Sequence, residues 1–214
     1  MSFFTNNPTD RTPGRISGNP TSGLCERVCI QAQKVFDACI RQTQVDGINL
    51  PLTNLTPANP AYPLTFVSAR STTTTGTVTN LQIDRLTDRR RFARVQATVT
   101  VPMEVLYTDA NGVAGSATSS VTLTQDIIMY LPEPSIVPFD VVAVVSIVSP
   151  DGVFVDGTTP SFTVSCCETI IMKVIMTVEL LVPSYGYAVI PQCQEYAQDV
   201  CSGFFDLPLY PNNS

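Results

Sequence analysis

The feature that most constrains the fold of this sequence is a long region in which apolar and mostly hydroxyl-bearing side chains alternate. The alternation occurs in four runs, at residues 77–83, 92–101, 121–127 and 141–148. A period of two places the apolar side chains on one face of a strand, and Asn111-Gly112 between two runs is a strong hairpin signal. Seven or more strands separated by turn residues predict a mainly β fold, an antiparallel β-sandwich or open barrel.

The segments on either side of the β region predict a different organisation. Ser22 can cap a helix whose apolar side chains recur at helical spacing, and Gly47 can end it. Proline and asparagine before this helix predict a flexible arm, and prolines after it predict a linker. A short helix is expected between Pro191 and Gly203. The expected order is flexible arm, Cys-bearing amphipathic helix, Pro-rich linker, β-sandwich domain and Cys-bearing tail, at residues 1–21, 22–46, 47–63, 64–190 and 191–214.

Seven cysteines accompany this pattern, and the chain has no histidine. All seven are candidates for disulfide cross-links: Cys25, Cys29, Cys39, Cys166, Cys167, Cys193 and Cys201. On the expected helix the first three share an arc of about 80° within the apolar stripe, where they need partners from elsewhere. Adjacent strand residues point to opposite faces, so Cys166 and Cys167 should divide between core and surface. An odd number leaves at least one thiol unpaired or bonded to another chain, and the pairing stays open.

The residue types argue against catalysis and against a cofactor. Without histidine the chain cannot form a Ser-His-Asp triad or a Cys-His dyad. No glycine-rich phosphate loop occurs, and the carboxylates are scattered singly. The cysteine spacings do not match paired Cys-x-x-Cys knuckles, so no metal site is assigned. We therefore expect a protein that is not an enzyme.

The charge balance argues against nucleic acid as a partner. The net charge is −6, and charged residues make up only 14% of the chain. Five arginines between positions 85 and 94 are interrupted by Asp88 and predict a solvated turn with local ion pairs, with an anionic partner surface as the alternative. No run reaches the roughly 18 apolar residues of a membrane span. So small a fraction of charged residues suits a protein that packs against neighbouring molecules. A stable β-sandwich with a threonine- and serine-rich surface is equally compatible with this composition.

Two segments, residues 24–39 and 165–196, resemble uncharacterised cysteine-rich proteins of spore-forming clostridia. The β region, with its hairpin at residues 105–112, also resembles the SPOCS domain of clostridial spore coat morphogenesis proteins. The chain has no LysM module of the kind that some SPOCS proteins carry, so a scaffold-recruiting role is not implied. The resemblance implies a non-enzymatic structural protein of the spore coat or exosporium, and it implies no active site.

The spore surface would explain why a cysteine-rich chain begins without the basic and apolar regions of a secretory signal. Such a protein is made in the mother cell cytoplasm, where thiols stay reduced, and meets oxidant when that cell lyses. Its expected partners are further copies of itself and other spore-layer proteins. Two alternatives stay open: a cell-surface appendage or S-layer-like subunit, and a cytoplasmic metal- or partner-binding module with reduced thiols. A phage or capsid-like β-protein is a more distant one.

Overall fold

The computed structural model describes residues 19–188, in which strands, turns and loops occur and no helix does. This part of the chain holds eight strands: β1 (Glu26–Pro51), β2 (Thr53–Thr56), β3 (Thr65–Ser71), β4 (Thr75–Arg85), β5 (Phe92–Thr108), β6 (Ala114–Tyr130), β7 (Asp140–Val155) and β8 (Ser161–Ser184). They form one sheet in the order β1-β8-β7-β3-β5-β6-β2, and β4 pairs with both β5 and β7. The predicted mainly β, antiparallel class is confirmed.

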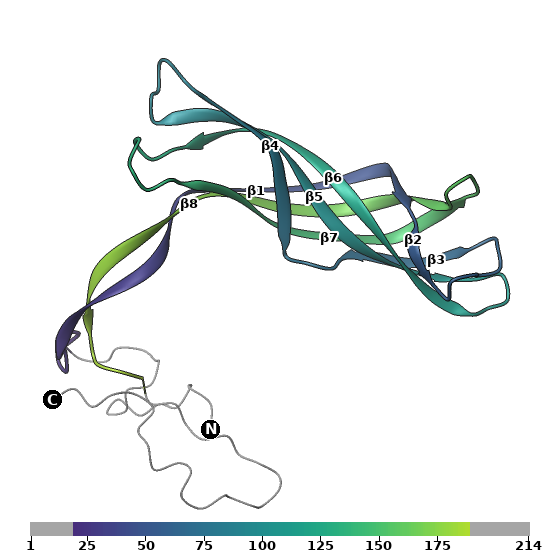
Figure 1. Ribbon diagram of the computed structural model, residues 1–214, viewed down its shortest axis with the longest axis horizontal. Coiled ribbons are helices and arrows are strands. Elements are labelled where there is room, and N and C mark those ends of the chain that lie inside the picture. The colour runs from purple at the N-terminus through teal and green to yellow at the C-terminus, as the bar shows by residue number, and fades with distance from the viewer. Residues whose placement is uncertain (1–18, 189–214) are drawn as a thin grey trace, which may run out of the picture. The chain divides into compact units, whose positions relative to one another are not determined.

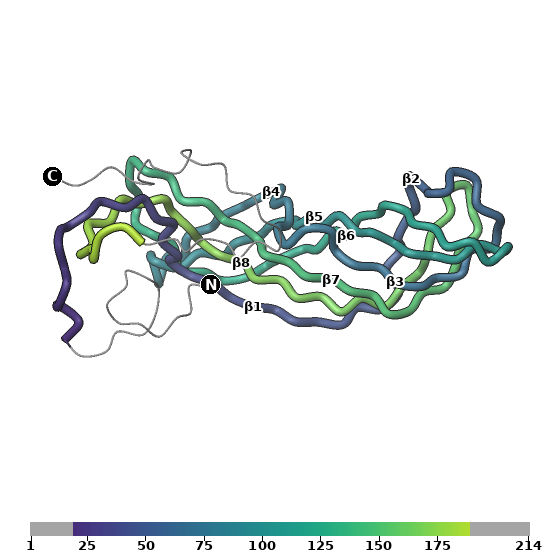
Figure 2. The backbone as a smooth tube through the Cα atoms, turned by 90° about the horizontal axis from the view of Figure 1, so that it is seen from below, coloured from purple at the N-terminus to yellow at the C-terminus, as the bar shows by residue number. Residues whose placement is uncertain are grey.

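A long, uninterrupted pairing joins β5 and β6, which run side by side in Figure 1. Their register is continuous from Phe92 opposite Tyr130 to Thr108 opposite Ala114. The predicted hairpin at Asn111-Gly112 is confirmed, since Gly112 has a φ of +80°, which glycine adopts without strain. On the other side of the sheet, β7, β8 and β1 are successive neighbours (Figure 2).

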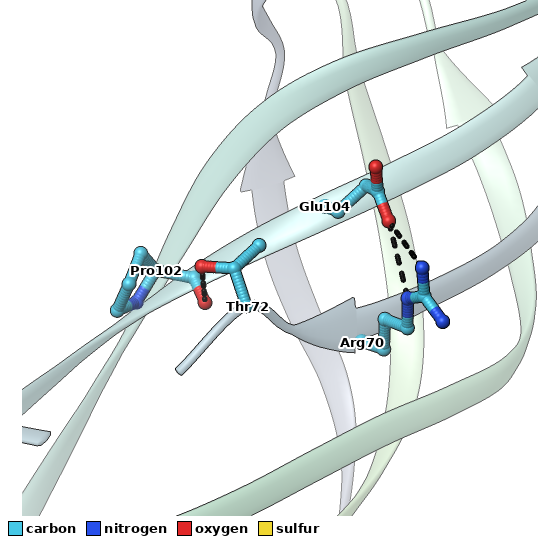
Figure 3. Close-up of polar contacts among 4 residues, drawn as sticks. All are labelled: Arg70, Thr72, Pro102 and Glu104. Carbon is cyan, nitrogen blue, oxygen red and sulfur yellow. Dashed lines mark hydrogen bonds and ion pairs between the residues drawn. The ribbon is translucent and has the colours of Figure 1, made fainter. Parts of the chain in front are cut away.

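Strands β3 and β4 share one edge of β5, and β5 passes from one of these partners to the other along its length. β3 pairs with the second half of β5 and β4 with the first half, and both also touch β7. Figure 3 shows the break between them, where the hydroxyl of Thr72 donates to the carbonyl of Pro102 at 3.4 Å. The backbone N–H of Thr72 donates to the same carbonyl at 3.0 Å. Pro102 has no N–H, and it lies where the ladder is already interrupted. Beside it, Arg70 pairs with Glu104 at 2.9 Å.

The core consists of the inward side chains of the long strands. Every second residue of β5 is buried, at positions 93, 95, 97, 99, 101, 103, 105 and 107. β8 has the same alternation over its buried stretch, from Phe162 to Met176. The period-two pattern that predicted strands thus also identified which side chains enter the core.

By backbone contacts the chain divides into two compact units. One comprises residues 33–178 and contains the core described above. The other combines residues 1–32 with residues 179–214. In the described part of this second unit, the N–H of Cys25 donates to the carbonyl of Ser184 at 3.0 Å. β1 and β8 contribute residues to both units.

The predicted amphipathic helix at residues 22–46 is wrong, because β1 occupies Glu26–Pro51. Its apolar side chains do not gather into one helical stripe, and Ile30, Val35 and Ile40 are exposed. The sequence here is rich in β-branched residues, which lose rotamer freedom in a helix and suit a strand. Hydrogen bonding to β8 supplies the pairing that decides between the two conformations.

The first part of the expected Pro-rich linker at residues 47–63 is strand, because it contains the end of β1 and all of β2. The compact unit at residues 33–178 consequently begins well before the β domain expected at residues 64–190. The expected arm at residues 1–21, apart from residues 19–21, and the tail with its short helix at residues 191–214 lie outside the described residues.

Candidate functional site

The candidate cross-linking cysteines occupy three kinds of environment in residues 19–188, and none of them is in a disulfide there. Cys25, Cys29 and Cys167 are exposed, Cys39 is half-buried and Cys166 is buried. Cys193 and Cys201 lie outside the described residues. Exposure therefore separates the five described thiols into those that another chain can reach and those that it cannot.

Cys25 lies just before β1, and Cys29 lies within its first four residues. The thiol of Cys25 donates to the carbonyl of Ser184 at 3.4 Å. Four residues of extended chain span about 13 Å, roughly twice the largest Cα separation of a disulfide. Cys25 and Cys29 therefore cannot bond to each other in this conformation. The helical arc that was expected to hold them does not exist, but the inference that they need other partners stands.

Cys166 and Cys167 point to opposite faces of β8, as predicted from their adjacency. Cys166 is fully buried, and its burial, with smaller effects of Glu168 and Cys167, raises the pKa of its thiol to about 11. It thus carries almost no thiolate at neutral pH and acts as a small core side chain. Cys167 is exposed on β8 and pairs with Val148 of β7. Of the two, only Cys167 can meet a thiol of another chain.

Cys39 lies between these extremes, since it is half-buried against the core on β1. Burial raises the pKa of its thiol, the negative charge of Asp37 raises it further, and a hydrogen bond with the backbone of Met172 opposes them. Both larger effects disfavour the thiolate, which is the reactive form. Cys39 is accordingly a weaker candidate for cross-linking than the exposed thiols.

A polar groove of about 430 Å³ lies between β1, β6 and β8. Its most unusual member is Glu168, whose side chain is only 8% exposed and whose Oε1 has no hydrogen-bond partner. Burial raises the pKa of this carboxyl, while the positive charge of Arg41 and a hydrogen bond with Thr43 oppose the rise. Sequence reasoning missed Glu168. The signal was its position in the period-two alternation. Glu168 lies two residues after Cys166, on the inward face of a strand whose other inward residues are apolar.

The predicted ion pairs around the arginine-rich turn are confirmed. Arg94 donates to Asp126 at 2.7 Å and Arg91 to Glu133 at 3.2 Å. Arg89 lies 3.9 Å from Asp88. These contacts are exposed and neutralise part of the basic cluster locally, which weakens the case for an anionic partner there.

Three further observations complete the description of residues 19–188. No helix there is long and apolar enough to cross a membrane. No three cysteine, aspartate or glutamate side chains in that range gather as metal ligands would. Comparisons of the chain with protein-family models, with curated proteins and with solved structures give no match.

Proposed function

We propose that this protein is a non-enzymatic structural subunit that assembles with copies of itself and is then reinforced by disulfides between chains. The observation that carries the proposal is the division of the cysteines by exposure. A core that needed disulfides for stability would join its buried thiols to each other. The buried Cys166 and the half-buried Cys39 are each free of a disulfide within residues 19–188. The exposed thiols of Cys25, Cys29 and Cys167 are the ones that serve contacts outside the chain.

The scaffold for this role is the large antiparallel sheet. In the proposal the sheet closes on itself as the predicted β-sandwich or open barrel, with the buried alternate residues of β5 and β8 as its inner face. Such a core is stable without disulfides, since a chain of this length can bury roughly 70% of its unfolded surface. The thiols are thus available for assembly and are not needed for folding.

The proposed location is the spore surface, coat or exosporium. It is supported by the likeness of residues 24–39 and 165–196 to clostridial cysteine-rich proteins. Assembly would begin in the mother cell with reduced thiols, and oxidation would follow lysis. For each disulfide, two thiols lose two protons and two electrons to dioxygen, an S–S bond forms, and hydrogen peroxide is released.

The cross-linking role predicts a difference between exposed and buried cysteines. Reduced protein exposed to air should form disulfide-linked multimers on a non-reducing denaturing gel. A variant with Cys25→Ser, Cys29→Ser and Cys167→Ser should lose most of them. The matched control with Cys39→Ala and Cys166→Ala should retain them, provided that circular dichroism shows it folded. The tail cysteines stay in place in both variants, so linkages that they form are common to both.

Equal multimer formation by the triple variant and the wild type would overturn the assignment of the exposed thiols. The location has its own test on purified spores of the source organism. Detergent extraction at boiling temperature should release the monomer only when a reductant is present. Equal release without reductant, or absence of the protein from spores, would contradict the proposed role there.

A further inference from the structure

The turn between β5 and β6 contains a chemically reactive dipeptide, Asn111-Gly112. The backbone nitrogen of the residue that follows an asparagine can attack the Cγ atom of the asparagine side chain and close a succinimide ring. Glycine offers no side chain to hinder this attack. None of the other asparagines in the chain is followed by glycine. The residue types alone therefore single out Asn111 as the site of deamidation.

The reaction needs no co-reactant except water, and Asn111 is exposed to solvent. The Gly112 nitrogen forms a bond to Cγ of Asn111, and the bond from Cγ to the side-chain nitrogen breaks. That nitrogen leaves as ammonia and takes with it the proton of the Gly112 N–H. Water then opens the succinimide at one of its two carbonyl carbons. The product is aspartate, or isoaspartate in which the main chain runs through the former side chain.

The folded turn holds the attacking nitrogen in a hydrogen bond. The N–H of Gly112 donates to the backbone carbonyl of Asp109 at 2.9 Å, and the N–H of Asp109 donates to the carbonyl of Val113 at 2.9 Å. To attack Cγ, the Gly112 nitrogen must lose its proton and leave this arrangement. Because the hydrogen bond stabilises the protonated amide, the closed turn opposes ring formation.

The side chain of Asp109 adds an electrostatic obstacle. Its Oδ1 atom accepts the N–H groups of Asn111 and Val113, on either side of Gly112, at 2.9 and 2.8 Å. A carboxylate this close disfavours a second negative charge on the Gly112 nitrogen. It also disfavours the oxyanion that forms when that nitrogen attacks. The carboxylate thus raises the barrier to the same step that the backbone hydrogen bond opposes.

A second loop fastens the turn to another part of the fold. The N–H of Ala61 donates to Oδ2 of Asp109 at 3.1 Å, and the N–H of Ala110 donates to the carbonyl of Ala61 at 2.9 Å. Ala61 lies in the connection between β2 and β3, so the tip of the hairpin is not free in solvent. Opening the turn breaks these hydrogen bonds together, which keeps the open state rare.

We propose that Asn111 is a deamidation site that Asp109 holds in check, so that the reaction proceeds only through a locally opened turn. The inference is independent of self-assembly. Conversion would be irreversible and would loosen the hairpin. Aspartate at position 111 brings a second carboxylate near Asp109. Isoaspartate lengthens the main chain next to the last pair of the β5–β6 ladder, Thr108 opposite Ala114.

The competing explanation is that the carboxylate of Asp109 promotes deamidation by removing the Gly112 proton as a general base. The hydrogen bonds favour restraint. Oδ1 is occupied by the N–H groups of Asn111 and Val113, whereas the Gly112 N–H donates to a backbone carbonyl. The two explanations predict opposite effects when the carboxylate is removed.

Peptide mapping by mass spectrometry measures the deamidation rate at Asn111 in full-length protein held at neutral pH. The same chain denatured in guanidinium chloride gives the rate without the turn. Folded wild-type protein should react at least roughly tenfold more slowly than the denatured chain. Asp109→Ala, shown to be folded by circular dichroism, should react at least roughly tenfold faster than folded wild type.

Gly76→Ala is the matched control for lost stability, because a Cβ atom there would lie 2.4 Å from Val99, away from the turn. It should leave the rate at Asn111 unchanged, and hydrogen exchange of the Gly112 amide should accelerate only in Asp109→Ala. Should Asp109→Ala not fold, Asp109→Asn removes the charge, retains an acceptor oxygen and should still react faster than wild type.

Three results would overturn the proposal. Equal rates in folded and denatured wild-type protein would show that the turn gives no protection. A slower reaction after removal of the Asp109 carboxylate would identify this group as a general base. Equal acceleration by Gly76→Ala and Asp109→Ala would assign the reaction to global unfolding and not to the turn.

Discussion

At the scale of single residues, Asp109 organises the turn between β5 and β6. Its carboxylate accepts the N–H groups of Asn111 and Val113 at 2.9 and 2.8 Å, and that of Ala61 at 3.1 Å. These bonds hold its pKa below the usual aspartate value, although burial opposes them. Removing the carboxylate leaves three backbone donors without their partner, which is costly where the site is buried.

Asp109→Ala should lower the free energy of unfolding at pH 7, measured by urea denaturation, because three backbone N–H groups lose their acceptor. Because the folded pKa is depressed, this stabilisation is present above the unfolded pKa of about 3.9 and disappears as pH falls through the lower folded value. The difference in unfolding free energy between wild type and variant should therefore become smaller as the pH is lowered. Asp156→Ala, at an exposed turn, is the control and should change stability by less than about 0.5 kcal/mol. A difference in unfolding free energy that stays constant from pH 7 to pH 2 would contradict a stabilising role for the Asp109 carboxylate.

The pKa of Glu168 is shifted in the opposite direction from that of Asp109. Burial raises its folded pKa, so the stability that its neutral form provides is present below the unfolded pKa and is lost as pH rises through the folded pKa. Glu168→Gln keeps the shape and cannot ionise. It should therefore gain stability relative to wild type between pH 4 and pH 8 in denaturant titrations. Glu179→Gln makes the same change at an exposed site, and an equal gain there would refute the explanation.

At the scale of elements, Gly76 lets β4 pass between its neighbours. A Cβ atom there would lie 2.4 Å from a methyl group of Val99 and 3.1 Å from one of Val145. Gly76→Ala should destabilise the protein by about 1–3 kcal/mol, because the surrounding side chains are close-packed. Gly157→Ala, where the nearest atom is 3.7 Å away, should be nearly neutral. The double change Gly76→Ala with Val99→Ala should cost less than the sum of its parts, and strict additivity in thermal unfolding would count against the clash.

At the scale of the whole molecule, the sheet depends on pairings between distant parts of the chain. Among the strands of residues 19–188, β1 and β8 are the first and the last, yet they are neighbours, and a hydrogen bond joins Cys25 to Ser184. Such non-local pairing closes large loops before it gains contacts, which slows folding.

Period-two patterning was sufficient to predict the mainly β class, the hairpin at Asn111-Gly112 and the opposite orientations of Cys166 and Cys167. These features depend on contacts within a few residues or within one hairpin, which sequence periodicity reports directly. It was not sufficient for residues 22–46, where the apolar spacing matched a helix. The burial of Glu168 could have been inferred from its position in the period-two alternation of the strand. Its place in the groove with Arg41 could not.

The sequence by itself determined which face of each long strand enters the core, because alternation is a local property of the chain. Only the tertiary structure decided that residues 26–51 are a strand and that this strand ends the sheet. The physical reason is that a β-strand satisfies its backbone hydrogen bonds through a partner, and the partner of β1 is β8, which lies more than a hundred residues further along. No local pattern encodes that choice.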